Sequence, residues 1–262
     1  MLTFAAENIL CMKKMLQALL QRLLGFDTYL FVFAIFKIRT LRWDPQEKEG
    51  DFNYFCKLLH PADVVLDIGA NVGIMTALMA RRCHLGRVLA FEPVPDNVKT
   101  LRRVIRYLKL PNVEVYPVAL GNQNSTIEMK MPVLSGVRMQ GLSHVGHESI
   151  ADYEGPYISY EVPQQALDET GLGDLSRIAA IKMDVENYEQ FILEGAMRLL
   201  QTHRPLIYCE LWDNENRQRC FALLRSLGYE VQVLVAGDLQ AFDPARHSHH
   251  NFFCIPSIPN IS

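Results

Sequence analysis

The apolar positions of the chain fall into two alternating patterns. Short runs rich in Val, Ile and Leu are typical of strands covered on both faces, and segments with apolar residues three and four positions apart predict amphipathic helices. The two patterns follow one another in order, which predicts an α/β fold with helices on both faces of a mostly parallel, seven-stranded sheet. The predicted strands are 64–66, 87–93, 113–119, 178–183, the run that begins at Leu206, 229–235 and 252–255, and the predicted helices are 52–59, 74–80, 97–110, 191–200 and 216–227.

Residues 1 to about 43 carry helical periodicity ahead of the first strand. The first of two predicted helices has an apolar stripe, and the second, 28–38, is apolar on nearly all sides. We therefore divide the chain into an N-terminal helical extension, 1–43, and a domain, 44–262, with its core at about 60–255. Two interpretations of the extension stay open: a helical pair packed on the domain or on a second subunit of a homo-oligomer, and a peripheral membrane contact through the apolar face and its flanking basic residues. The stripe consists of Met12, Met15, Leu16, Leu19, Leu20, Leu23 and Leu24.

The stretch from Ser125 to Tyr160 has a different character. Residues 125–131 alternate apolar and polar positions, which predicts an edge strand or the arm of a hairpin. Residues 132–160 are rich in Gly, Ser and His and predict an irregular segment. Because long loops in a compact domain are usually functional, we interpret 132–160 as the cover of a substrate site.

Composition and charge narrow the class of protein. Hydrophobic residues make up 49% of the 262 residues, enough for a large core, and the formal net charge of −3 offers no electrostatic footprint for nucleic acid. The six cysteines form no Cys-x-x-Cys pair, which argues against a structural zinc site and fits a reducing compartment. The longest apolar run, 29–36, is far shorter than the ~20 residues of a membrane-spanning helix, and no signal-peptide cleavage site is evident. We therefore expect a cytoplasmic protein, with membrane association as the alternative given above.

The most informative stretch is 64–73, in which a buried strand leads into Asp67 and is followed by Gly69 and Gly73. A helical pattern, 74–80, begins at once. Strand, glycine turn and helix are the arrangement by which an α/β sheet presents backbone N–H groups to a ligand at its carboxyl edge. Glycine leaves room for a ligand to lie against the main chain. The turn therefore predicts a site for a nucleoside-containing cofactor, the alternative being a plain turn without a ligand.

The spacing of the glycines decides between cofactors. A dinucleotide turn has the pattern Gly-x-Gly-x-x-Gly, but its second and third glycines are replaced here by Asn71 and Ile74. Asp67 suits a positively charged ligand such as S-adenosylmethionine, which carries a sulfonium and an ammonium group. Glu92 closes the next strand about 20 residues after Gly73, where an acid accepts hydrogen bonds from ribose hydroxyls. An NAD(P)-dependent oxidoreductase and a non-catalytic cofactor-binding protein stay as alternatives.

The order of these motifs resembles the FkbM family of methyltransferases over roughly residues 60–255. The resemblance implies a Rossmann-like fold, S-adenosylmethionine as the methyl donor and, most often, methylation of a hydroxyl on a sugar or related metabolite. The expected partner is then a small-molecule or saccharide acceptor. Asn187 departs from the family pattern, which usually has glycine after Asp-Val-Glu. The matching segments are 67–73, 91–93, 119–121, 162–163 with 167–168, 181–186, 193–196, 204–205 and Glu210.

The catalytic candidates lie mainly at the carboxyl end of the fourth strand. Methyl transfer from a sulfonium is an in-line displacement that benefits from orientation and a dry site, and a hydroxyl of high pKa also needs a general base. Asp184 and Glu186 are the first candidates, with Lys182 beside them, and His144 is the second. For Asp184, a structural role in orienting Lys182 or a backbone amide is the alternative. The residues expected to bind the cofactor are Asp67, Gly69, Ala70, Asn71, Gly73, Glu92, Pro93, Ala119 and Asp184.

Two metal sites can be considered. Asp184, Asp213 and Asn214 follow adjacent strands and offer oxygen ligands of the kind that Mg²⁺ prefers. Nothing in their spacing requires a metal, however. The histidine cluster at 247–250 lies in a polar segment near the C-terminus, and we interpret it as surface histidines. We therefore expect no metal.

Overall fold

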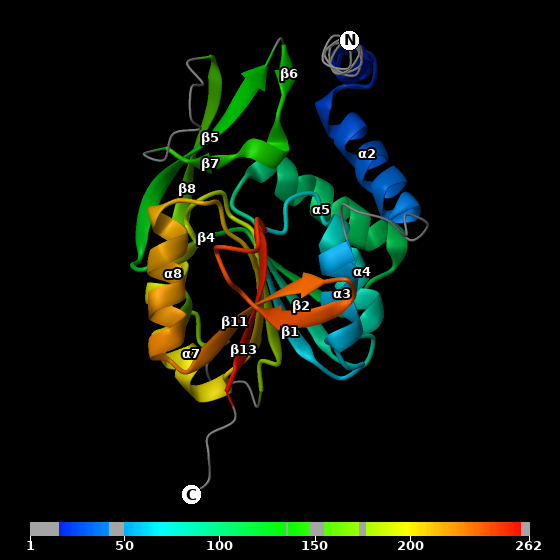
Figure 1. Ribbon diagram of the computed structural model, residues 1–262. Coiled ribbons are helices and arrows are strands. Elements are labelled where there is room, and N and C mark those ends of the chain that lie inside the picture. Colours follow the sequence, from blue (N-terminus) through cyan, green and yellow to red (C-terminus); the bar gives the residue numbers. More distant parts are fainter. Residues whose placement is uncertain (1–15, 42–49, 135, 147–154, 173–176, 258–262) are drawn as a thin grey trace, which may run out of the picture.

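The computed structural model describes residues 16–41, 50–134, 136–146, 155–172 and 177–257. Their strands form two sheets, a main sheet of eight strands and a smaller second sheet that lies above it in Figure 1. Along the main sheet the strands follow the order β12 (Asp238–Ala241), β11 (Tyr229–Val235), β13 (Asn251–Pro256), β10 (Leu206–Glu210), β9 (Ala180–Met183), β1 (Val64–Ile68), β2 (Arg87–Phe91) and β3 (Val113–Tyr116).

The main sheet is mixed. The five strands from β10 to β3 are mutually parallel, whereas β13, β11 and β12 join as antiparallel strands. The predicted α/β, Rossmann-like class is confirmed, but the predicted seven strands are one too few. The missed strand, β12, is short and largely exposed, and it pairs with β11 across a tight turn at Ala236 and Gly237, both with positive φ. Its sequence, Asp-Leu-Gln-Ala, has none of the apolar density that marks the buried strands.

The second sheet was not predicted as a sheet. The order is β4 (Ala119–Gly121), β8 (Tyr157–Ala166), β5 (Ser125–Leu134) and β6 (Val137–Arg138), with β7 (His144–Val145) also on β5. The hairpin arm expected at 125–131 is confirmed, because β5 pairs antiparallel with β8 from Ser125↔Gln164 to Pro132↔Tyr157. The prediction that 132–160 is irregular is wrong for most of its described residues. They form strands by pairing with partners distant in sequence.

Two other boundaries also differ from prediction. The expected strand 113–119 is divided between β3 and β4, because the chain leaves the main sheet around Pro117, which has no N–H to donate. The expected helix 191–200 is interrupted at Gly195 and Ala196. A Cβ on Gly195 would lie 2.0 Å from the backbone oxygen of Gly121, so β4 approaches too closely for a larger residue there.

Helices cover both faces of the main sheet, as predicted. One hydrophobic core includes Ile192, Leu199 and Phe221 from the helices on one face, and a second includes Leu30, Phe52 and Met79 from those on the other. The helices that follow the extension are α3 (Gly50–Leu58), α4 (Ile74–Arg82), α5 (Pro95–Leu108), α6 (Glu189–Glu194), α7 (Met197–His203) and α8 (Glu215–Ser226).

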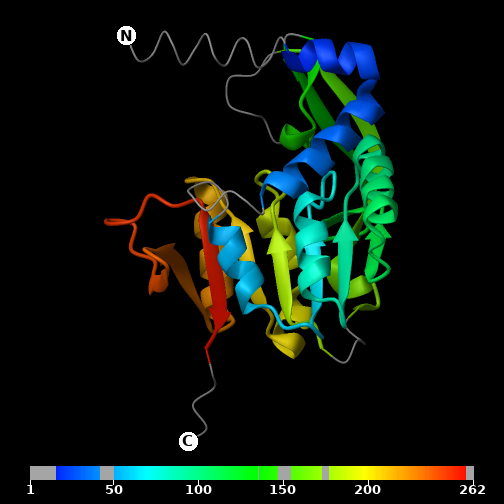
Figure 2. The same cartoon turned by 90° about the vertical axis from the view of Figure 1, so that its right-hand side faces the viewer.

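The N-terminal extension contains a helix at 16–24 and α2 (Phe26–Thr40), which confirms the predicted helical pair in its described part. Met12 and Met15 of the predicted stripe lie outside the described residues. Helix α2 lies beside α4 and α5 (Figure 2), and its Leu30 and Ala34 are fully buried. None of the described helices is long and apolar enough alone to cross a membrane; these two meet that criterion only together, across a bend of 120°.

Candidate active site

The glycine turn lies at the centre of the parallel strands. Strand β1 is flanked by β2 and β9, so the residues that follow all three strands meet at one edge of the sheet. The N–H groups of Gly69 and Ala70 both donate to the backbone oxygen of Phe91, at 3.0 Å each. A Cβ on Gly69 would lie only 1.9 Å from the backbone oxygen of Asp184, and its φ is +78°. Glycine is therefore required here by the neighbouring strand, whereas the sequence argument explained it by the approach of a ligand.

Asp67 lies beneath the turn. It is fully buried, accepts a hydrogen bond from Thr76 Oγ1 at 2.5 Å, and has Oδ1 3.3 Å from Lys182 Nζ. Lys182 also donates to the backbone oxygen of Gly69 at 3.0 Å and lies 3.8 Å from Asp184. Burial alone would lower the pKa of Lys182, but Asp67 and Asp184 together raise it, so the lysine stays charged. This ion pair fixes the underside of the turn, and Lys182 satisfies the negative charge that was expected to face the cofactor.

Glu92 is buried at the end of β2. Its carboxylate accepts hydrogen bonds from Asn71 N–H at 2.8 Å, from Val94 N–H at 2.9 Å and from Asn97 Nδ2 at 3.1 Å. Burial raises the pKa of Glu92, and these donors counteract the rise. These contacts bring the backbone of Asn71 and the side chain of Asn97 to the Glu92 carboxylate.

A cavity opens beside this turn. Of the residues predicted from the sequence, those that line it are Gly69, Asn71, Glu92, Pro93, Ala119, Asp184 and Glu186. Those that lie outside the described lining are Asp67, Ala70, Gly73, Lys182 and His144.

Several lining residues were missed by sequence reasoning. Asn97 lies five positions after Glu92 on the first turn of the next helix, a spacing that could have identified it. Gln140, Ser143 and Val145 come from the second sheet and its connections, and no pattern in the sequence indicated their position. The interpretation of 132–160 as a cover of the substrate site stays a prediction.

The cavity fits a cofactor that donates hydrogen bonds. The side-chain oxygens of Asn71 and Asn97 are both buried and have no partner among the described residues. Buried acceptors of this kind are rare without a partner, and both residues line the cavity beside the Glu92 carboxylate. Hydroxyl groups of a ribose, or the amino group of an adenine, would satisfy them.

A cluster of carboxylates borders the cavity at the ends of β9 and β10. Burial, together with the nearby Asp184, Glu210 and Glu189, raises the pKa of Glu186 to about 8, although a hydrogen bond from Trp212 counteracts this. Glu186 is held at φ +55°, an uncommon conformation for a residue other than glycine. Asn187 follows at φ +72°, so the position where the family usually has glycine keeps a left-handed backbone.

Glu189 is a buried acid that sequence reasoning did not single out. Burial raises its pKa to about 7, against hydrogen bonds that include one from Asn216 Nδ2 at 2.6 Å. Val185 N–H also donates to Glu189, at 3.4 Å. Glu189 therefore supports the segment that carries Glu186 and adds negative charge behind it.

His144 does not face the cavity. It lies on β7, where side chains alternate between two faces, and its neighbour Val145 lines the cavity instead. The His144 ring is buried against Tyr157, and its Nδ1 lies 3.0 Å from the backbone oxygen of Leu142.

The residues considered as metal ligands have other partners. Asp213 forms an ion pair with Arg217, and Asn214 caps α8 and donates to Asn187 Oδ1 at 2.7 Å, away from the cavity lined by Asp184. Among the described residues, no three His, Cys, Asp or Glu side chains are grouped so as to hold a metal. Of the three histidines near the C-terminus, His247 and His249 are half-buried and in edge-to-face contact, and His250 is exposed.

The chain is similar to known methyltransferases. Residues 67–239 match the family described as methyltransferase FkbM domain. The chain is 28% identical over 195 residues to the 31-O-demethyl-FK506 methyltransferase FkbM of Streptomyces tacrolimicus, covering 66% of this chain and 75% of that protein. It is 26% identical over 184 residues to Methyltransferase 1 of Beauveria bassiana (strain ARSEF 2860), covering 64% of this chain and 73% of that protein.

A solved structure shares the fold. The crystal structure of methyltransferase FkbM from Methylobacillus flagellatus KT superposes with a TM-score of 0.50 and 16% identity, covering 76% of this chain and 45% of that chain. The match thus spans less than half of that longer protein.

The fold and these matches define the class of protein, the S-adenosylmethionine-dependent methyltransferases. Because the family match extends over well more than half of its length, the chain belongs to the FkbM methyltransferase family. S-adenosylmethionine is its cofactor, as the turn and the resemblance predicted. The unpartnered acceptors beside Glu92 fit the nucleoside part of that molecule.

Proposed function

We propose that the protein transfers a methyl group from S-adenosylmethionine to a hydroxyl group of a sugar or related metabolite. Support comes first from the relative named 31-O-demethyl-FK506 methyltransferase, whose name places the transfer at an oxygen. The observation that carries the proposal is Glu186, a carboxyl group on the cavity wall with a pKa of about 8. A carboxylate this basic is suited to accept the proton of a hydroxyl nucleophile.

In this mechanism one side of the cavity binds the cofactor, and the other side accepts the proton of the nucleophile. Glu92 and Asn97 would accept hydrogen bonds from the nucleoside, and the buried Asp67–Lys182 pair keeps the turn in place. When bound, S-adenosylmethionine would supply an electrophilic methyl group on its sulfonium, with S-adenosylhomocysteine as the leaving group. Glu186 accepts the proton of the attacking hydroxyl, and the negative charge of Asp184 keeps Glu186 basic.

The far wall of the cavity suits a polar acceptor. Gln140 and Ser143 contribute polar groups there, and Met129 and Val145 contribute apolar surface. A molecule with several hydroxyls and an apolar ring face would match this mixture, as saccharides do. The apolar part excludes water from the reacting groups.

The test is transfer of a radiolabelled methyl group from S-adenosylmethionine into extracts of glycans and metabolites, followed by mass spectrometry of the product. We expect label in an ether-linked methyl group, much less label with Glu186→Gln, and full label with Glu161→Gln, a matched change of an exposed acid on β8. Label on nitrogen or carbon would disprove O-methylation. Binding of NADH in place of S-adenosylmethionine would favour an oxidoreductase.

A further inference from the structure

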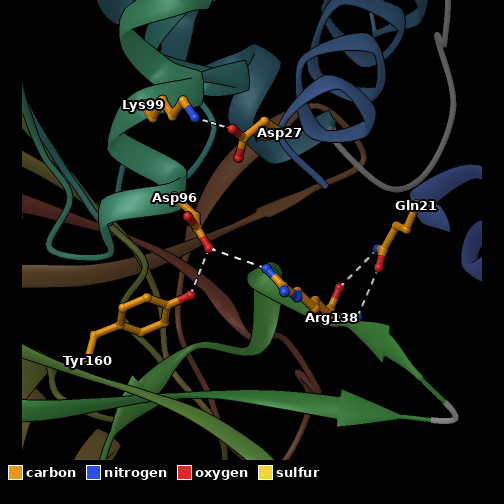
Figure 3. Close-up of polar contacts among 6 residues, drawn as sticks. All are labelled: Gln21, Asp27, Asp96, Lys99, Arg138 and Tyr160. Carbon is orange, nitrogen blue, oxygen red and sulfur yellow. Dashed lines mark hydrogen bonds and ion pairs between the residues drawn. The ribbon is translucent and has the colours of Figure 1, made fainter. Parts of the chain in front are cut away.

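The N-terminal helices contact the second sheet through a pair of hydrogen bonds (Figure 3). Gln21, in the helix 16–24, accepts a bond from the Arg138 N–H at 3.1 Å, and its Nε2 donates to the Arg138 backbone oxygen at 3.3 Å. A carboxamide has the same donor and acceptor as a peptide group, so Gln21 contacts β6 as an additional strand would. The two residues are far apart in sequence, and this contact joins the extension to the domain.

The Arg138 side chain continues the connection toward α5. Its Nη1 lies 3.8 Å from Asp96 Oδ2, and its guanidinium lies 4.7 Å from the centre of the Phe26 ring. Tyr160, on β8, donates to the same Asp96 oxygen at 2.8 Å. Burial and the Asp96 charge raise the pKa of Tyr160, so its hydroxyl remains a donor. Asp96, in the first turn of α5, thus joins this helix to both β6 and β8 (Figure 3).

This cluster adjoins the cavity from two directions. Asn97, which follows Asp96, lines the cavity, and so do Gln140 and Ser143, which come shortly after Arg138. Residues 140–142 form a single 3₁₀ turn, held by short-range bonds such as Leu142 N–H to Met139 O at 3.0 Å. Such a turn has little stability of its own, so its position depends on the strands at its ends.

We propose that Gln21 and Arg138 are positioning residues that hold the 140–143 wall over the cofactor cavity. The N-terminal helices, which precede the family match at 67–239, thereby control release of the cofactor and presentation of the acceptor. Neither side chain lines the described cavity; both act through the backbone of β6. The inference goes beyond the proposed function, because it holds whichever acceptor is methylated.

The test compares two substitutions on the same helix. Gln21→Ala removes the contact with β6. Gln17→Ala is the matched control, because Gln17 Nε2 donates to Tyr29 Oη at 2.7 Å within the extension itself. We expect Gln21→Ala to increase hydrogen–deuterium exchange of residues 137–145. Dissociation of S-adenosylhomocysteine should become roughly three- to tenfold faster, which is the effect of losing a typical hydrogen bond. Gln17→Ala should leave both close to wild type.

A second pair of variants keeps the test decisive if Gln21→Ala folds poorly. Arg138→Ala removes the Asp96 and Phe26 contacts, and Arg138→Lys keeps the charge. We expect faster S-adenosylhomocysteine dissociation with Arg138→Ala and partial restoration with Arg138→Lys. Unchanged exchange and dissociation in Gln21→Ala and Arg138→Ala would overturn the proposal, as would equal effects of Gln21→Ala and Gln17→Ala. Neither readout requires methyl transfer, so failure of the proposed acceptor class would leave this result intact.

Discussion

Glu92 is the residue whose neighbours most restrict what the cavity can bind. Its carboxylate already accepts hydrogen bonds from Asn71, Val94 and Asn97. Glu92→Gln turns one oxygen into an NH₂ group that faces donors, and it would remove the proposed acceptor for the ribose. We expect the Kd for S-adenosylmethionine, measured by calorimetry, to rise about ten- to a hundredfold, the value of a hydrogen bond to a charged group.

The control for this change is Glu114→Gln. Glu114 is an exposed acid on β3 that pairs with Arg87, so its substitution should leave cofactor affinity unchanged. Thermal unfolding of both variants separates lost binding from lost folding. Unchanged affinity in Glu92→Gln would remove the assignment of Glu92 to the ribose.

The raised pKa of Glu186 predicts how the rate of methyl transfer depends on pH. With a pKa of about 8, the residue is mostly protonated at pH 6 and mostly ionised at pH 9. Because only the carboxylate accepts a proton, kcat should rise with pH, reach half its maximum near pH 8 and level off above about pH 9. Glu186→Gln should lower kcat by about 10² to 10⁴ and abolish this rise. The measurement is initial rate at saturating substrate across pH 6–9.5.

Asp184→Asn gives a second readout on the same group. The Asp184 charge contributes to the raised pKa of Glu186, so its removal should move the midpoint of the profile to lower pH. A midpoint that stays in place would show that another group titrates. A profile without any rise would contradict the role of Glu186 as base.

The position of a cavity residue was predictable where it follows the end of a predicted strand. It was less predictable where it depends on how strands and side chains pack. The sequence identified Glu92, Asp184 and Glu186 because acids at strand ends meet at one edge of a sheet. It did not reveal that Lys182 neutralises Asp67, because the pairing depends on the register between β1 and β9, in which Asp67 lies opposite Lys182.

The turn after β1 allows an element-scale test of why its glycines are needed. A Cβ at position 69 would lie 1.9 Å from a backbone oxygen of the segment after β9, whereas a Cβ at position 73 would meet only the end of the Leu101 side chain, at 2.5 Å. Both have positive φ. Gly73→Ala should therefore cost about 1–2 kcal/mol of unfolding free energy for its left-handed backbone.

Gly69→Ala should cost more than about 4 kcal/mol, in the range of exceptional substitutions, because two strands would have to separate. Urea denaturation of each variant without cofactor measures the difference. Equal costs would show that the backbone conformation, and not the approach of the two segments, determines the requirement for glycine at position 69.

At the scale of elements, the sequence predicted the main sheet better than the second one. The strands of the main sheet are buried on both faces, so each carries its own apolar signal. Strands β5 and β8 are only half-covered, and their pairing bridges a long connection. These strands form because they pair with partners distant in sequence. The periodicity of a short stretch of sequence does not reveal such pairing.

At the scale of the whole molecule, the extension and the domain share one core. Leu30 and Ile38 of α2 belong to the same hydrophobic cluster as Met79 and Val88, although the family match begins only at residue 67. The sequence predicted the helices but not this continuity, because an apolar helix is equally consistent with burial against a domain, a second subunit or a lipid surface.

Global stability should fall as pH rises through neutrality. The pKa of Glu189 is raised from 4.5 to about 7 and that of Glu186 from 4.5 to about 8, so the folded state binds protons that the unfolded state has released. The stabilisation they provide is fully present below about pH 4.5 and is lost as pH rises through 7 and 8. Each unit of pKa corresponds to about 1.4 kcal/mol, so each of the two acids contributes a loss on the order of a few kcal/mol.

The measurement is the Tm of the cofactor-free protein between pH 5 and 8.5. Lys182, whose pKa is raised from a model-compound value of 10.5, does not titrate in this window, and the Asp51 and Glu92 carboxyls, whose pKa values are also raised by burial, act in the same direction. Glu189→Gln carries no titrating group and should reduce the slope between pH 6 and 8, whereas Glu161→Gln should leave it unchanged. A Tm that rises from pH 6 to 8.5 would mean that these acids are ionised in the folded protein, and the basicity assigned to Glu186 would fail with it.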